Sequence, residues 1–222
     1  MADNDKTGVD LGAAEFGEDD LSFIFDTANK YYQEVRVTKV EGECPYGHNV
    51  GDTFRVTARN HDGLCGSLYQ LINGDVLTLG YGGEIPWARE KGIMKASCPE
   101  GNKVQVAVRR VKQQKPISLK TRTDTREMTG KGYPALDKYR IYLEVLGIEN
   151  ICMWEHKIDE RFEIDPFNVG KCCGMLYKVA YPFVNLLLSD GKLPWEGEEH
   201  IIHSVCPDPY DLLTFRLIRE LR

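Results

Sequence analysis

The apolar positions of the chain form short alternating runs around one helical stretch, and this order occurs twice. In the first half, valines alternate with polar residues over 35–40, and shorter alternating runs follow over 54–56 and 104–108. Alternation of this kind is typical of strands with one buried face. Residues 64–72 instead place apolar side chains at helical spacing, which predicts the main helix of this half.

The second half repeats the pattern. Strands are predicted over 142–148, 162–164 and 213–217, and a helix is predicted from 172 to about 188. Pro182 is expected to break or bend this helix, because proline lacks the N–H that a helix interior uses. Four or more short strands and one main helix in each half predict an α+β fold, with two small antiparallel sheets packed as a pseudo-two-fold dimer.

The remaining segments flank and connect these halves. Residues 1–33 are expected to form a polar, disordered or loosely docked tail and then a short amphipathic helix over 20–32 that covers one half. The first repeat unit is expected over 34–111 and the second over 139–222. Between them, residues 112–138 are basic and lack an apolar period, which predicts a linker.

The repetition extends to individual residues at a constant offset of 108 positions. Each half reads Cys-x3-His-x16-Cys-x32-Cys, formed by Cys44, His48, Cys65 and Cys98 in the first half and by Cys152, His156, Cys173 and Cys206 in the second. A repeat of this quality indicates a tandem duplication of one unit of roughly 80 residues.

Four motifs of the chain resemble those of a family of small uncharacterised prokaryotic proteins that is common in anaerobes. They are Cys-Pro-Tyr-Gly-His from Cys44, Gly-Leu-Cys-x3-Tyr from Gly63, Gly-Gly-Glu-x-Pro-Trp from Gly82 and Cys-Pro-Asp-Pro from Cys206. Members of this family usually contain one copy of the unit, and the resemblance covers nearly all of both halves. It implies a family but no particular activity.

Charge and cysteine usage narrow the class of protein. A formal net charge of −6 argues against nucleic-acid binding, which depends on Lys and Arg contacts to phosphates. Because no run of about 18 apolar residues is present and the N-terminus is acidic, neither a membrane span nor a signal peptide is expected. Seven cysteines without export predict reduced thiols in a cytoplasmic protein, where they are more often metal-binding or catalytic than disulfide-bonded.

One interpretation of the repeated Cys/His set is a metal site. Three thiolates and one imidazole form a tetrahedral set that suits zinc, and thiolates also suit iron. The ligands would be Cys44, His48, Cys65 and Cys98, and again Cys152, His156, Cys173 and Cys206. The wide spacing is unlike the close cysteine pairs of most zinc modules, so the fold would have to bring these residues together.

A second interpretation is thiol chemistry without a metal. Cys65 is predicted in the first turn of a helix, where the dipole and free amides stabilise a thiolate, and His48 would act as its acid–base partner. The catalytic residues would be Cys44, His48 and Cys65, with Cys152, His156 and Cys173 in the second half. A small apolar pocket for a ligand or cofactor would be lined by Tyr69, Trp87, Tyr177 and Trp195, although corner packing is the commoner role of such tryptophans.

A third interpretation treats the cysteines as core residues and His48 as bonded to the backbone. Two functions follow from these alternatives. One is a small enzyme that uses a Cys/His site on a small organic substrate in the cleft between the halves. The other is a non-catalytic metal- or ligand-binding or redox-sensing module with structural cysteines.

Overall fold

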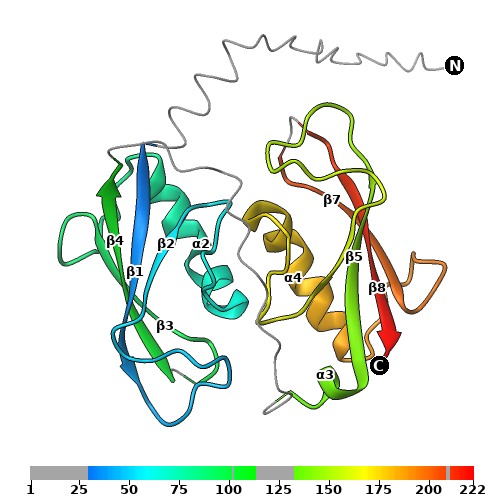
Figure 1. Cartoon of the computed structure of the whole chain (residues 1–222), viewed down its shortest axis with the longest axis horizontal. Helices are drawn as coiled ribbons and strands as arrows, with labels where there is room; N and C mark the ends of the chain where they lie inside the picture. Colours follow the sequence, from blue (N-terminus) through cyan, green and yellow to red (C-terminus); the bar gives the residue numbers. More distant parts are fainter. Residues whose placement is uncertain (1–29, 102, 114–132, 209–210) are drawn as a thin grey trace, which may run out of the picture.

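The computed structural model describes residues 30–101, 103–113, 133–208 and 211–222 of the chain. These residues form two units of one architecture, each a four-stranded antiparallel sheet with a helix against one face (Figure 1). The α+β class and the two antiparallel sheets that the sequence predicts are thereby confirmed. Within the described ranges, no helix is long and apolar enough to cross a membrane.

Unit 1 contains the first sheet and its helix. Its elements are β1 (Tyr31–Val40), β2 (Thr53–Val56), α2 (Gly66–Gly80), β3 (Ile93–Ser97) and β4 (Val104–Lys112). The strands lie in the order β2-β1-β4-β3, so β3 is at one edge of the sheet.

Unit 2 repeats this arrangement. Its elements are α3 (Ala135–Lys138), β5 (Tyr139–Gly147), β6 (Arg161–Ile164), α4 (Gly174–Leu188), β7 (Ile201–Val205) and β8 (Thr214–Leu221). The strand order is β6-β5-β8-β7, and β6, α4 and β7 begin and end 108 positions after β2, α2 and β3. The edge strand β7 is therefore the counterpart of β3.

Each sheet buries one face under its helix. In β4, Val104, Val106 and Val108 are buried, and the residues between them are more exposed. This alternation places every second side chain on the covered face. Leu68 and Ile72 of α2 are fully buried and belong to the same apolar core.

The structure differs from the sequence prediction at three points. Tyr31 and Tyr32 begin β1 and are not helical, whereas the earlier part of the predicted N-terminal helix lies outside the described residues. The edge strands β3 and β7 were not predicted, because each has five residues and only a weak apolar alternation. The predicted linker lies mostly outside the described residues, but its end forms α3 with Leu136 buried.

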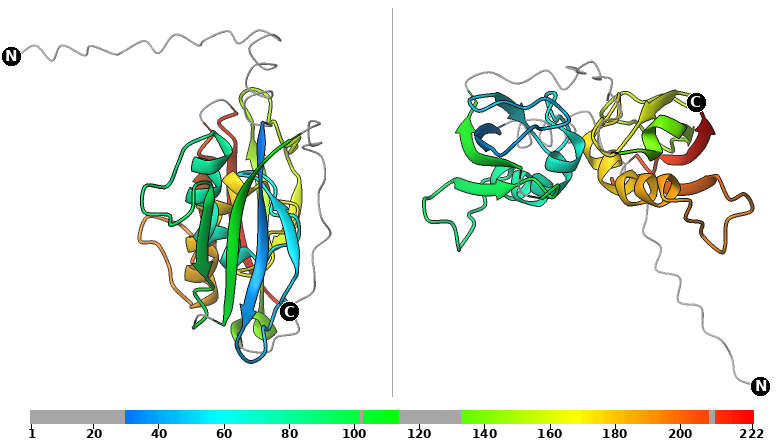
Figure 2. Two further views of the ribbon diagram at one scale, coloured as in Figure 1. Left: turned by 90° about the vertical axis from the view of Figure 1, so that its left-hand side faces the viewer. Right: turned by 90° about the horizontal axis from the view of Figure 1, so that it is seen from below.

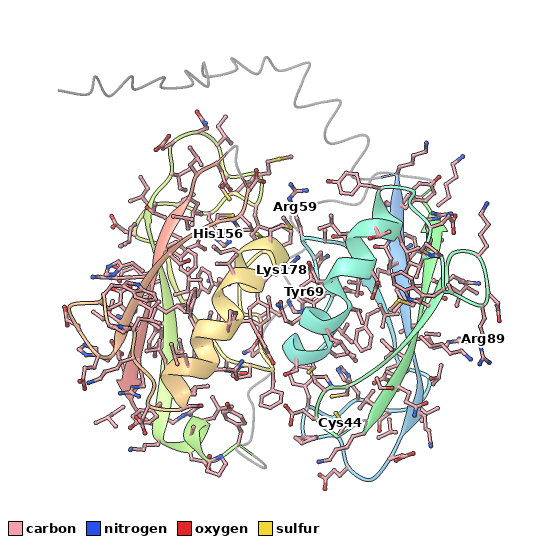
Figure 3. The ribbon with its side chains drawn as sticks, turned by 180° about the vertical axis from the view of Figure 1, so that it is seen from behind. Cys44, Arg59, Tyr69, Arg89, His156 and Lys178 are labelled. Atoms are coloured by element: carbon pink, nitrogen blue, oxygen red, sulfur yellow. The ribbon has the colours of Figure 1, made fainter. Side chains whose placement is uncertain are left out.

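The helices α2 and α4 lie side by side where the two units meet (Figures 1 and 2). Pro182 lies inside a continuous α4, so the predicted break is wrong, and the predicted bend stays a prediction. A proline leaves the carbonyl four residues earlier, here that of Lys178, without its helical donor. The side-chain Nε2 of Gln70 in α2 lies 3.4 Å from this carbonyl, and Lys178 is on the side of α4 that faces unit 1 (Figure 3).

Backbone hydrogen bonds join the two units at the start of each helix. The N–H of Gly66 donates to the carbonyl of Phe167, and the N–H of Gly174 donates to the carbonyl of Arg59 at 2.8 Å. The two bonds are reciprocal, because Gly174 and Phe167 lie 108 positions after Gly66 and Arg59. The Arg59 guanidinium also reaches across the contact to Asp208, at 3.4 Å.

Close approach of the units explains the glycine in the repeated Cys-Gly motif. A Cβ added at Gly66 would collide with the hydroxyl of Tyr177, and a Cβ added at Gly174 would collide with the hydroxyl of Tyr69. Both tyrosines are fully buried. A side chain at either glycine would therefore have to displace the opposite tyrosine or separate the two units locally.

We predict that Gly66→Ala and Gly174→Ala each lower the free energy of unfolding by about 1–3 kcal/mol, the usual cost of overpacking a tight contact. Chemical denaturation measures this change. Gly74→Ala is the matched control, because Gly74 lies in the middle of α2 with nothing within 4 Å of an added Cβ. It should raise stability by roughly 0.5–1 kcal/mol through helix propensity. Similar effects of all three substitutions would contradict the tight contact.

Candidate functional site

The Cys-x3-His segments are tight loops that follow the first strand of each unit. In unit 1, the N–H of Gly47 donates to the carbonyl of Cys44 at 2.9 Å, and Gly47 has a φ of +82°. In unit 2, Glu155 takes this place, donates to the carbonyl of Cys152 at 2.8 Å and has a φ of +61°. A left-handed backbone favours glycine, so unit 2 keeps the same turn with a less suitable residue.

These loops direct each histidine to the start of the helix in its own unit. Nε2 of His48 accepts a hydrogen bond from the N–H of Cys65 at 3.2 Å, and Nε2 of His156 accepts one from the N–H of Cys173 at 3.4 Å. Both imidazoles are buried, and Nδ1 of His156 lies 2.7 Å from Oε2 of Glu160. The Nε2 lone pair is thus used by a backbone donor, and each histidine fixes the first turn of a helix.

The cysteines are mostly buried thiols. Cys65 and Cys173 are the N-cap residues of α2 and α4, and burial raises the pKa of both to about 12. Burial also raises the pKa of Cys98 and Cys152, whereas Cys44 is the half-buried member of the set. Burial therefore opposes the thiolate that the sequence predicts at the helix start, because desolvation of the charge outweighs the hydrogen bonds from the neighbouring N–H groups.

The thiols of each unit lie near one another. Charge on Cys98 raises the pKa of Cys65, and the Asp211 carboxylate accepts hydrogen bonds from the thiols of Cys152 and Cys206. Within the described part of the chain, however, no group of three or more His, Cys, Asp or Glu side chains is arranged to hold a metal ion. The four-ligand zinc or iron sets therefore stay predictions from the sequence.

The repeated tyrosines do not line a pocket as predicted. Tyr69 and Tyr177 are fully buried, and their hydroxyls donate to backbone carbonyls of Ala58, at 2.8 Å, and of Asp165, at 2.9 Å. Because the same hydroxyls lie against the glycines at the contact between units, these tyrosines hold the junction together.

The repeated tryptophans behave in the opposite way. Trp87 is 78% exposed and Trp195 is 75% exposed, so neither packs into a corner as the sequence favours. They belong to the loops that follow α2 and α4, and these loops project at opposite ends of the molecule, away from the contact between units (Figure 2). A large aromatic side chain left in water at the same position of both units is a feature of binding surfaces.

A groove of about 490 Å³ lies beside Trp87 in unit 1. It is bounded by α2, by the edge strand β3 and by the loop between them, and its lining includes Leu71, Asp75, Trp87, Ala88, Met94 and Lys95. Arg89 also borders it, at the outer edge of unit 1 and well apart from Cys44 (Figure 3). Of the predicted site residues, only Trp87 is part of this groove.

Two separate features therefore emerge from one predicted site. In unit 1 the Cys/His set lies at the helix start in the interior, and the groove opens at the outer edge of the sheet. In unit 2, Cys152 and His156 also border an open hollow of about 580 Å³. The sequence missed the groove because β3, which supplies one wall, was not predicted. The signal that pointed to it was the repeated Gly-x-x-Pro-Trp motif that begins at Gly83 and Gly191.

Comparisons with family models, with curated proteins and with solved structures each find no match to the chain.

We predict that the thiols differ sharply in their rates of alkylation at pH 8. The half-buried Cys44 should react with iodoacetamide first, and Cys65 and Cys173 should react far more slowly because their raised pKa keeps them protonated. Mass spectrometry of peptides from timed samples measures each rate, and all seven cysteines should react after denaturation. Alkylation of Cys65 or Cys173 as fast as that of Cys44 in the folded protein would contradict this assignment.

Proposed function

We propose that this protein is a non-catalytic ligand-binding module in which the groove of unit 1 binds a small organic molecule and the Cys/His sets stabilise the two units. The observation that supports it best is the separation of the two features. In unit 1, His48 is buried and bonded to a backbone N–H group, whereas the apolar groove lies elsewhere, beside Trp87. A nucleophilic thiol at Cys65 would need a charge that its burial disfavours.

The groove has the properties of a small-molecule site. Its volume falls within the range of roughly 300–1,000 Å³ that is typical of ligand pockets, and its walls are mainly apolar with a few polar groups at the rim. Trp87 lies at its mouth with most of its surface exposed. A ligand that covers this indole would bury a large apolar area, which favours binding.

Unit 2 differs at the positions that shape the groove. Phe183 stands where unit 1 has Asp75, and Glu196 stands where it has Ala88. Both replacements are larger, so we assign ligand binding to unit 1 and a supporting role to unit 2. In this proposal the two units pack as a pseudo-two-fold dimer within one chain, as the reciprocal bonds of Gly66 and Gly174 indicate. A reducing cytoplasmic compartment suits its free thiols.

Binding of the neutral fluorescent probe N-phenyl-1-naphthylamine tests the proposal. The folded protein should bind the probe in an apolar groove, and Trp87→Ala should weaken binding by about tenfold, which corresponds to about 1.4 kcal/mol. Trp195→Ala is the matched control, because it removes an equally exposed tryptophan from unit 2 and should leave the affinity unchanged. Equal effects of the two substitutions, or no binding by the parent protein, would overturn the assignment to unit 1.

A second prediction concerns the histidines. His48→Phe keeps the volume of the ring but removes the acceptor of the Cys65 N–H, so it should lower the free energy of unfolding by about 1–3 kcal/mol. His48→Gln retains an acceptor and should cost less. Both variants should bind the neutral probe as the parent protein does. Loss of binding in a folded His48→Phe variant would instead connect the Cys/His set to function.

A further inference from the structure

The outer edge of β3 borders the groove. On this edge the N–H of Ile93 donates to the carbonyl of Glu90, and the N–H of Lys95 is a further outward donor. The N–H of Cys98 donates to the carbonyl of Val104 at 2.7 Å, and Lys95 is opposite Ala107 in the same antiparallel register. Hydrogen-bonded and non-hydrogen-bonded pairs alternate along such a ladder. The N–H of Lys95, three residues before Cys98, therefore points away from β4 and toward the open edge. No hydrogen bond from it is found among the described residues.

The equivalent N–H in unit 2 is not open, because a carboxylate binds it. Oε1 of Glu196 accepts a hydrogen bond from the N–H of His203 at 2.8 Å, and Oε2 lies 2.9 Å from Nδ1 of the same residue. His203 is the counterpart of Lys95 at the offset of 108. These bonds lower the pKa of Glu196, so the group at the edge of β7 is an ionised, half-buried carboxylate.

Unit 1 lacks this internal carboxylate. Ala88 replaces Glu196, and the space beside the edge N–H belongs to the groove, which both Ala88 and Lys95 line. The side-chain charges around the groove are balanced, since Arg89 and Lys95 are matched by Asp75 and Glu90. The preference for an anionic group therefore rests on the outward N–H of Lys95. Its counterpart in unit 2, the N–H of His203, donates a hydrogen bond to the Glu196 carboxylate.

We infer that the groove of unit 1 binds a small carboxylic acid with an apolar chain, whose carboxylate takes the place that Glu196 occupies in unit 2. The carboxylate accepts the hydrogen bond of the Lys95 N–H. The apolar chain lies between Leu71 of α2, Met94 of β3 and the indole of Trp87, which line the groove. This assignment rests on the proposed function and specifies its ligand class.

Octanoate and octanamide provide the test, because they differ in charge but hardly in shape. At pH 7, octanoate should displace N-phenyl-1-naphthylamine at a concentration about tenfold lower than octanamide, as expected for a charge-assisted hydrogen bond. In ¹⁵N-resolved NMR spectra of the full chain, octanoate should shift the amide signal of Lys95 downfield, and octanamide should shift it less.

A substitution that gives unit 1 the residue found at the same position of unit 2 completes the experiment. Ala88→Glu should place a carboxylate at the β3 edge as in unit 2, move the Lys95 amide signal without any ligand and weaken octanoate binding at least about tenfold. Ala88→Gln fills the same space without the charge and should move this signal less. Equal displacement of the probe by octanoate and octanamide would overturn the carboxylate assignment and leave the apolar groove in place. Failure of the neutral probe to bind would overturn both proposals.

Discussion

The hydrogen bond between Nε2 of His48 and the N–H of Cys65 fixes the geometry on which the rest of unit 1 depends. It connects the loop after β1 to the first turn of α2, where backbone donors lack helical partners. A buried donor left without an acceptor costs about 1–3 kcal/mol, so the loop and the helix start hold each other in place. With its start fixed, α2 crosses the sheet in one position. That position puts Gly66 against unit 2 and Leu71 beside the edge strand β3.

The duplication supplies an internal comparison of what the fold requires and what it leaves free to change. The two histidines, the Cys-Gly helix starts and the buried tyrosines are the same in both units, and each makes an equivalent contact in the interior or at the junction. The positions around the groove differ, with Asp75 opposite Phe183 and Ala88 opposite Glu196. The residues that hold each unit together are thus the same in both units, whereas residues at the outer edge differ between them.

The sequence predicted the larger elements well but missed the groove. Alternating valines located β1 and β4, and helical spacing located α2 and α4, because these elements bury a continuous apolar face. The strand β3 was not predicted, because an edge strand of five residues buries little apolar surface and so has only a weak alternating pattern. The Cys/His repeat was found at once, but spacing alone could not show that Nε2 of His48 faces a backbone N–H. That depends on how the loop folds over the helix.

An edge strand carries backbone donors and acceptors that another chain could pair with, so proteins protect such edges. The edge of β7 is protected by the Glu196 carboxylate, which satisfies the N–H of His203. The hydrogen bonds with His203 lower the pKa of this half-buried carboxylate and keep it ionised. At β3 the equivalent N–H, that of Lys95, lies beside the groove of about 490 Å³ that the Trp87 loop borders. At one edge the outward donor is therefore satisfied by a carboxylate of the chain itself, whereas at the other edge it lies beside the groove. In our proposal, this difference between Ala88 and Glu196 is the reason that ligand binding is assigned to unit 1.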